Sequence, residues 1–160
     1  MSKKEKILAL MIENLRQELE VILTSARSAR QAATHEESRA EDAHDTRGLE
    51  ASYLAGAQAA RAESLKKLIH VFQFSKLREF KAGDPIDAGA WVRLESDGGE
   101  FDYLLVAQGG GISVTFEGKS IQIITLQSPI GEALMGRKAG DAIEVEGQKQ
   151  SREYEIRSVS

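Results

Sequence analysis

The side chains best suited to chemistry gather in one short segment. Five carboxylates lie between positions 36 and 45 with a single basic residue, Arg39, among them: Glu36, Glu37, Glu41, Asp42 and Asp45. Carboxylates packed this closely raise one another's proton affinity and attract divalent cations. A solvated acidic loop that only prevents aggregation has the same composition, so the segment alone leaves both interpretations open.

Other motifs with catalytic associations fail on spacing or context. His35 and His44 flank the acids, but their spacing matches no zinc-binding pattern. Gly118-Lys119-Ser120 resembles the end of a phosphate-binding loop, yet that motif needs glycine at the position of Ser113. The chain has no cysteine, and no combination of serine, histidine and acid indicates a nucleophilic site. The sequence therefore does not indicate an enzyme in its own right.

A long helical pattern leads into the acidic segment. Apolar positions recur at alternating spacings of four and three, which predicts a helix over about 4–34 with this seam: Leu8, Ile12, Leu15, Leu19, Ile22, Ala26, Ala29 and Ala33. Such a helix, roughly 45 Å long at ~1.5 Å per residue, needs a partner helix to cover its apolar face.

The partner helix is predicted over about 49–79. Its seam begins with Tyr53, Ala57, Ala60 and Ser64 and continues, after a phase shift, with Leu65, Leu68 and Phe72. The short polar connection favours an antiparallel hairpin with its acidic tip at residues 35–46. Small seam residues lie near the tip, so we expect the distal half to be thinner and less stable. An ordinary alanine-rich coiled coil and a finger shaped for a narrow channel both fit this gradient.

From Phe80 onward the pattern changes to short strands. Lys81-Ala82-Gly83-Asp84-Pro85 marks a domain boundary, because proline disfavours helical geometry in the residue before it. Strands are expected at 91–95, 101–106, 112–116, 121–126, 142–146 and 153–159, and one helix at about 129–135 with Ser128 as N-cap. The predicted class is α+β: a coiled-coil hairpin over 1–80, then a mostly antiparallel sheet with one short helix over 81–160.

Composition and charge exclude some classes. The chain has 160 residues, 41% hydrophobic and 29% charged, which is typical of a soluble globular protein. A net charge of −4 argues against general nucleic-acid binding. No apolar run approaches the ~20 residues that span a bilayer, so we expect a cytoplasmic protein with no membrane partner. Basic residues along the helices are either solvated or steer the finger into an acidic or RNA-containing cavity: Arg27, Arg30, Arg61, Lys66 and Lys67.

One run of the second half, from residue 124 to residue 141, reads ITLQSPIGEALMGRKAGD. With its SPIG, ALMGR and GD elements, and with the hairpin before it, the chain resembles the bacterial Gre transcript-cleavage factors, in whose C-terminal domains these elements are typical. The resemblance covers the whole chain. It implies an FKBP-like C-terminal domain, and an accessory transcription elongation factor instead of an enzyme. It also implies a monomer that binds bacterial RNA polymerase at the secondary channel and its rim.

The resemblance further implies what the tip does. In that family an Asp-x-x-Glu pair at the tip helps to hold a magnesium ion of the polymerase active centre, near the nascent RNA 3′ end. The factor alone binds no cofactor tightly. Aligning Tyr53 with the family tyrosine places the pair on Thr46 and Leu49, which are not acids. The nearest acids are Asp45 and Glu50, at a wider spacing than the family has.

The candidate site residues follow from this alignment. The candidate catalytic residues are Asp45, Asp42, Glu41 and Glu50, of which Asp45 and Asp42 are the candidate magnesium ligands within the polymerase. By the same resemblance, the candidate polymerase-docking surface consists of Ser128, Pro129, Ile130 and Gly131.

Two activities remain open at the sequence level. A reshaped tip can still deliver its acids and stimulate cleavage of backtracked transcripts. Alternatively, the protein is a non-cleaving regulator that occupies the channel and modulates or inhibits transcription. Two other classes are a prolyl isomerase, suggested by the FKBP-like fold alone, and a coiled-coil dimerisation module without polymerase contact.

Overall fold

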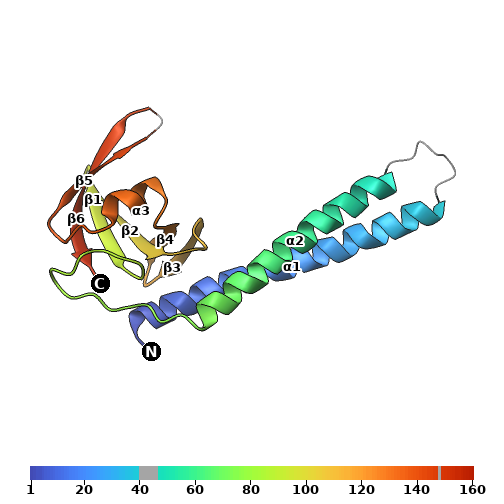
Figure 1. The fold of residues 1–160 in the computed structure, drawn as a ribbon, viewed down its shortest axis with the longest axis horizontal. Helices are drawn as coiled ribbons and strands as arrows, with labels where there is room; N and C mark the ends of the chain where they lie inside the picture. The colour runs from blue at the N-terminus through green and yellow to red at the C-terminus, as the bar shows by residue number, and fades with distance from the viewer. Residues whose placement is uncertain (40–46, 148) are drawn as a thin grey trace. The chain divides into compact units, whose positions relative to one another are not determined.

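The computed structural model describes residues 1–39, 47–147 and 149–160. These residues form, in chain order, two long helices, four strands, a short helix and two further strands (Figure 1). They divide into two compact units, Ile12–Phe74 and Met1–Met11 with Ser75–Ser160. The predicted α+β class is confirmed, with long helices first and a sheet with one short helix after them. No helix in this part of the chain is both long and apolar enough to cross a membrane.

Two antiparallel helices make up the unit Ile12–Phe74. Helix α1 (Lys3–Arg39) and helix α2 (Arg47–Gln73) lie side by side there (Figure 1). Leu15 of α1 and Leu65 of α2 are fully buried. The Arg61 guanidinium donates a hydrogen bond to the Glu18 carboxylate at 2.9 Å. A contact between residues so far apart in sequence requires the chain to double back, as the predicted hairpin does.

The buried face of α2 differs from the predicted seam in its first part, whereas Leu65, Leu68 and Phe72 are buried or half-buried as predicted. Ala57, Ala60 and Ser64 are exposed. Buried or half-buried positions with unbroken spacings of four and three run along the helix instead, flanked by the half-buried Ala59 and Leu68: Gln58, Ala62, Leu65, Ile69 and Phe72. The predicted phase shift is therefore wrong. A polar residue at a seam position concealed the register, and the Oε1 atom of Gln58 is buried without a hydrogen-bond partner among the described residues.

Helix α2 also ends earlier than predicted, at Gln73 instead of residue 79. The ring of Phe80 is buried in the core of the second unit. Residues 75–80 run toward it without helical structure. Burial of this aromatic side chain outweighs the helix propensity of the preceding residues, which is a weak preference by comparison.

The first turn of α1 is held within the same unit as the sheet. The ammonium of Lys4 donates hydrogen bonds to the carbonyl of Arg78 and, at 2.8 Å, to the carbonyl of Gly89. It also lies 4.8 Å from the ring centroid of Phe80. Burial lowers the pKa of Lys4 to about 8, against an opposing contribution from Glu79. One ammonium therefore joins the start of the chain to two backbone segments that precede the sheet.

The described strands form one sheet in the order β3-β4-β2-β1-β6-β5. Their bounds are β1 Trp91–Ser96, β2 Gly99–Val106, β3 Ile112–Phe116, β4 Lys119–Thr125, β5 Ala142–Glu146 and β6 Ser151–Val159. All neighbouring pairs are antiparallel except β2 and β4, which are parallel. The predicted hairpin turn at Asp97 and Gly98 is confirmed, and both residues have the positive φ of a type I′ turn.

The core of this unit lies between the sheet and helix α3 (Pro129–Leu134), which packs against β4 and β5 (Figure 1). Leu134 of α3 is fully buried with Val92 and Leu94 of β1 and Leu105 of β2. Leu104, the neighbour of Leu105, is equally buried. Since successive side chains of a strand point to opposite faces, β2 is covered on both sides.

Candidate functional site

The acidic tip lies mostly outside the described residues. This holds for Glu41, Asp42 and Asp45, three of the four candidate catalytic residues. Glu50 belongs to α2, but its side chain is not among those described. Residues 40–46 nevertheless form the connection between the two helices, because α1 ends at Arg39 and α2 begins at Arg47. The acids at the tip therefore remain a prediction.

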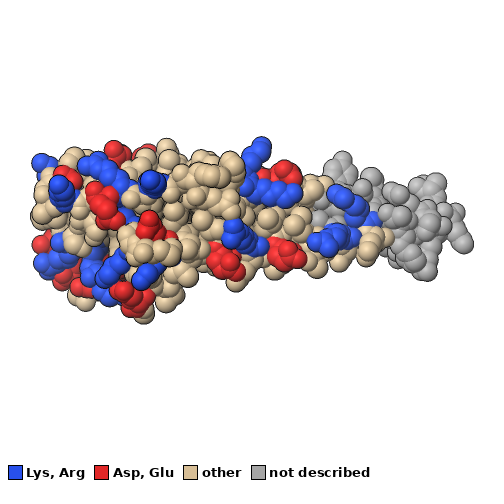
Figure 2. Space-filling model, turned by 90° about the horizontal axis from the view of Figure 1, so that it is seen from below, with Lys and Arg blue, Asp and Glu red and all other residues tan. Residues whose placement is uncertain are grey.

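The shaft of the hairpin carries charges of both signs. The basic residues singled out in the sequence are all exposed: Arg27, Arg30, Arg61, Lys66 and Lys67. Arg61 contacts Glu18 at 2.9 Å and Lys66 contacts Glu63 at 3.1 Å. Figure 2 shows basic and acidic side chains next to one another on the hairpin face in view. Since ion pairs neutralise part of the positive charge, the shaft is not a uniformly basic surface.

Three carboxylate, histidine or cysteine side chains are needed for a plausible protein metal site. No such group occurs among the side chains that the structure describes.

The candidate docking residues, 128–131, form the start of α3. Ser128 has extended backbone geometry and acts as the N-cap, and its Oγ atom accepts a hydrogen bond from the Gly131 amide at 3.0 Å. The same hydroxyl donates to the carbonyl of Thr125 at 2.8 Å. Pro129 occupies the first helical position, where the missing amide proton costs no hydrogen bond. The N-cap predicted from the sequence is confirmed.

Gly131 is required for this turn because no side chain fits there. A Cβ atom at this position would lie 2.1 Å from the Thr125 carbonyl oxygen and 2.9 Å from Ser128 Oγ. The backbone of α3 at Gly131 thus lies closer to the end of β4 than it could if this residue had a side chain. Gly131 and Ser128 therefore have structural roles that hold α3 on the sheet.

The four docking candidates consequently face different ways. Gly131 is buried and Ile130 is half-buried against the core, whereas Pro129 is exposed. Glu132 and Met135, which the sequence reasoning did not select, are also exposed. Residues three apart share one face of a helix, so Pro129 and Glu132, together with Met135 at the C-cap, form the accessible face of α3. The three-residue spacing of Pro129, Glu132 and Met135 was the signal in the sequence that could have identified this face.

The Gly-Asp element that completes the run also has a structural explanation. Gly140 has φ of 96° and its amide donates to the Ile156 carbonyl at 2.8 Å. The Asp141 carboxylate accepts a hydrogen bond from the Lys138 amide at 2.9 Å. The element is thus a tight turn between α3 and β5 whose backbone is hydrogen-bonded to β6.

Comparison with known families identifies the class of protein. The family model for the C-terminal part of the transcription elongation factors GreA and GreB matches residues 81–160, which include the whole sheet and α3. The chain therefore belongs to the GreA/GreB family of transcription elongation factors.

Several solved structures are similar to the chain. For GreA factor homolog 1 (Gfh1) of Thermus thermophilus the identity is 25%, covering 93% of this chain and 94% of that one, with a TM-score of 0.40. For Gfh1 of Thermus aquaticus the identity is 25%, the coverage 92% of both chains and the TM-score 0.41. For the elongation factor GreA/GreB from Nitrosomonas europaea the identity is 22%, covering 61% of this chain and 79% of that one, with a TM-score of 0.38. Among curated proteins, none matches the chain.

Proposed function

We propose that this factor binds bacterial RNA polymerase and inserts the hairpin of α1 and α2 into the secondary channel, where the tip stimulates cleavage of backtracked transcripts. The observation that carries the proposal is one chain that joins a GreA/GreB C-terminal region to an antiparallel helical hairpin with acids between its helices. The factor acts on the hydrolytic activity of the polymerase and has no reaction of its own.

The two halves of the chain have different tasks in this proposal. The C-terminal region docks on the rim of the channel through the accessible face of α3: Pro129, Glu132 and Met135. The hairpin supplies reach, because the 27 residues of α2 extend about 40 Å at ~1.5 Å per residue. Buried leucines in the seam hold the two helices together as one probe.

The tip supplies oxygen ligands. We assign Asp45 and Asp42 to a magnesium ion of the polymerase active centre, with Glu41 and Glu50 next to them in sequence. A metal ion in such a site activates water and stabilises the leaving oxygen. The factor holds no magnesium tightly by itself, since an exposed turn offers too few fixed oxygens for this ion.

The second candidate function is occupancy of the channel without cleavage. It is favoured by Thr46 and Leu49, which stand where the family has its acid pair when Tyr53 is aligned. Metal-assisted chemistry tolerates little misplacement, and about 1 Å can reduce the rate ~100-fold. In this alternative the hairpin enters the channel but its acids do not reach the metal.

Transcript cleavage in stalled elongation complexes tests the proposal. The wild-type factor should accelerate shortening of the RNA, and Asp45→Ala should abolish the acceleration while polymerase binding is retained. Glu20→Ala, which removes an exposed acid from the shaft of α1, should behave as wild type. A factor that binds but leaves the rate unchanged is a non-cleaving regulator, and a factor that does not bind disproves both candidates.

A further inference from the structure

The sheet contains a gap between two of its central strands. Strand β2 begins at Gly99 and β4 begins at Lys119, but their parallel pairing starts only at Asp102 and Ile121. Residues 99–101 and 119–120 therefore lie outside the paired register between these two strands. Backbone amide and carbonyl groups that face such a gap can form hydrogen bonds with another chain or with water.

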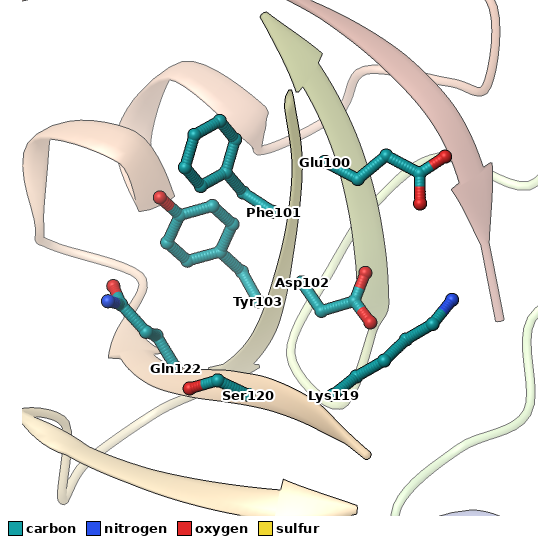
Figure 3. Close-up of a pocket in the computed structure, with 7 residues that line it drawn as sticks. All are labelled: Glu100, Phe101, Asp102, Tyr103, Lys119, Ser120 and Gln122. Atoms are coloured by element: carbon teal, nitrogen blue, oxygen red, sulfur yellow. The ribbon is translucent and has the colours of Figure 1, made fainter. Parts of the chain in front are cut away.

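A cavity of 340 Å³ lies at this gap, lined by Glu100, Phe101, Asp102, Tyr103, Lys119, Ser120 and Gln122 (Figure 3). Its side chains separate into two sets. Phe101, Tyr103 and Gln122 lie on one side of the strands, and Glu100, Asp102 and Lys119 lie on the other. The volume is at the small end of the ~300–1,000 Å³ that ligand pockets have, so the ligand must be small.

The first set is uncharged and aromatic. Phe101 is 36% exposed and packs edge-to-face on Tyr154, with ring centroids 6.0 Å apart. Tyr103 is only 6% exposed, and burial raises the pKa of its hydroxyl, which therefore stays a donor. In the described part of the chain, neither this hydroxyl nor the Gln122 amide has a side-chain hydrogen bond. An apolar ligand group thus meets an aromatic ring beside two uncommitted polar groups.

The second set offers an ammonium without an ion pair among the described residues and a carboxylate that is only loosely paired. Asp102 is already satisfied, because Arg93 donates to its two carboxylate oxygens at 2.8 and 3.1 Å. The Glu100 side chain is 57% exposed and forms a long ion pair with Arg93, with Nε and Oε2 4.0 Å apart. Lys119 makes no ion pair with any described residue. A carboxylate and an ammonium are therefore both available at the same opening.

We propose that this cleft binds a short zwitterionic peptide of about two or three residues. Lys119 takes the terminal carboxylate and Glu100 takes the terminal ammonium. Backbone groups of β2 and β4 that lie outside their paired register form hydrogen bonds with the peptide amides, as a sheet edge does with an added strand. An apolar side chain of the peptide enters the gap between the starts of β2 and β4 and contacts the ring of Phe101 on the other side of the strands. The site is separate from the hairpin and from the accessible face of α3, so it is independent of the polymerase proposal.

The test is a titration of the full chain with the dipeptide alanyl-phenylalanine, followed by amide shifts in nitrogen-15 NMR. Saturable shifts should be confined to residues 99–103 and 119–122. The same dipeptide with an acetylated amine and an amidated carboxyl group should bind at least about tenfold more weakly, because both charge-assisted contacts are lost. Equal binding of the blocked dipeptide, or no saturable shift up to millimolar concentration, overturns the proposal.

Variants locate the site. Lys119→Gln should weaken binding of alanyl-phenylalanine about tenfold. Lys138→Gln is the matched control, because Lys138 is also exposed but does not line the cavity, and it should bind as wild type. Unchanged amide shifts elsewhere establish that each variant is folded. Equal weakening by both lysine variants shows only general attraction between charges and contradicts the assignment.

Discussion

Replacing Gly131 with alanine should destabilise the C-terminal unit by about 2–4 kcal/mol. The added Cβ atom would lie 2.1 Å from the Thr125 carbonyl oxygen, where an ordinary contact is well over 3 Å. The first turn of α3 must therefore move by about 1 Å or more. Overpacking of this kind costs ~1–3 kcal/mol, and movement of the turn also weakens the Ser128 cap, which contributes ~1 kcal/mol.

Urea unfolding of the full chain measures this effect. The chain has one tryptophan, and Trp91 lies in β1, so its fluorescence reports on the sheet. Gly56→Ala is the matched control, because nothing lies within 4 Å of a Cβ atom at that position of α2. It should stabilise the hairpin by up to ~1 kcal/mol, seen by circular dichroism. A change of less than about 0.5 kcal/mol for Gly131→Ala would refute the close seating of α3 on the sheet.

Three further substitutions have defined outcomes. Gln58→Leu should stabilise the hairpin by about 1 kcal/mol, measured by urea unfolding of the helical signal, since it removes a buried oxygen without a partner; a loss of stability would contradict this. Asp102→Ala should cost about 2–4 kcal/mol by tryptophan fluorescence, because it leaves the Arg93 guanidinium without its bidentate partner. Lys4 has a folded-state pKa of about 8, below its ordinary 10.5, so the unfolded chain binds more protons between these values. Stability should therefore rise with pH across that window, and Lys4→Met should show a smaller rise in its urea midpoint; identical pH dependence would be inconsistent with a buried ammonium.

Local signals in the sequence predicted much of the fold correctly. Asp97-Gly98 specified a two-residue turn, and Ser128-Pro129 specified the start of a helix, because each depends on the conformation of one or two residues. The change of pattern after Phe80 likewise separated helices from strands. The parallel pairing of β2 with β4 was not predictable, since it depends on contacts between distant segments.

The errors came from residues whose surroundings decide their role. Gln58 is polar, so the alternating pattern of α2 was assigned to the wrong face. Phe80 is buried in the C-terminal core, which ended α2 earlier than its propensity indicated.

The docking motif was located in the sequence but not resolved into roles. Ser128 and Gly131 shape the turn, whereas the accessible face belongs to Pro129, Glu132 and Met135. A motif shows where the members of a family have similar sequences. Only the contacts in the structure distinguish the residues that shape the turn from the residues that are exposed on its surface.

The most direct test of the central claim places a probe at the tip of the hairpin. The chain has no cysteine, so Asp42→Cys gives a single site for a photo-crosslinker, and Glu144→Cys on β5 gives the control. In a stalled, backtracked elongation complex, the probe at residue 42 should crosslink to the polymerase active centre or the RNA 3′ end, and the probe at residue 144 should not. Absence of that crosslink from residue 42 while the factor is bound, or equal crosslinking from both positions, would contradict the account.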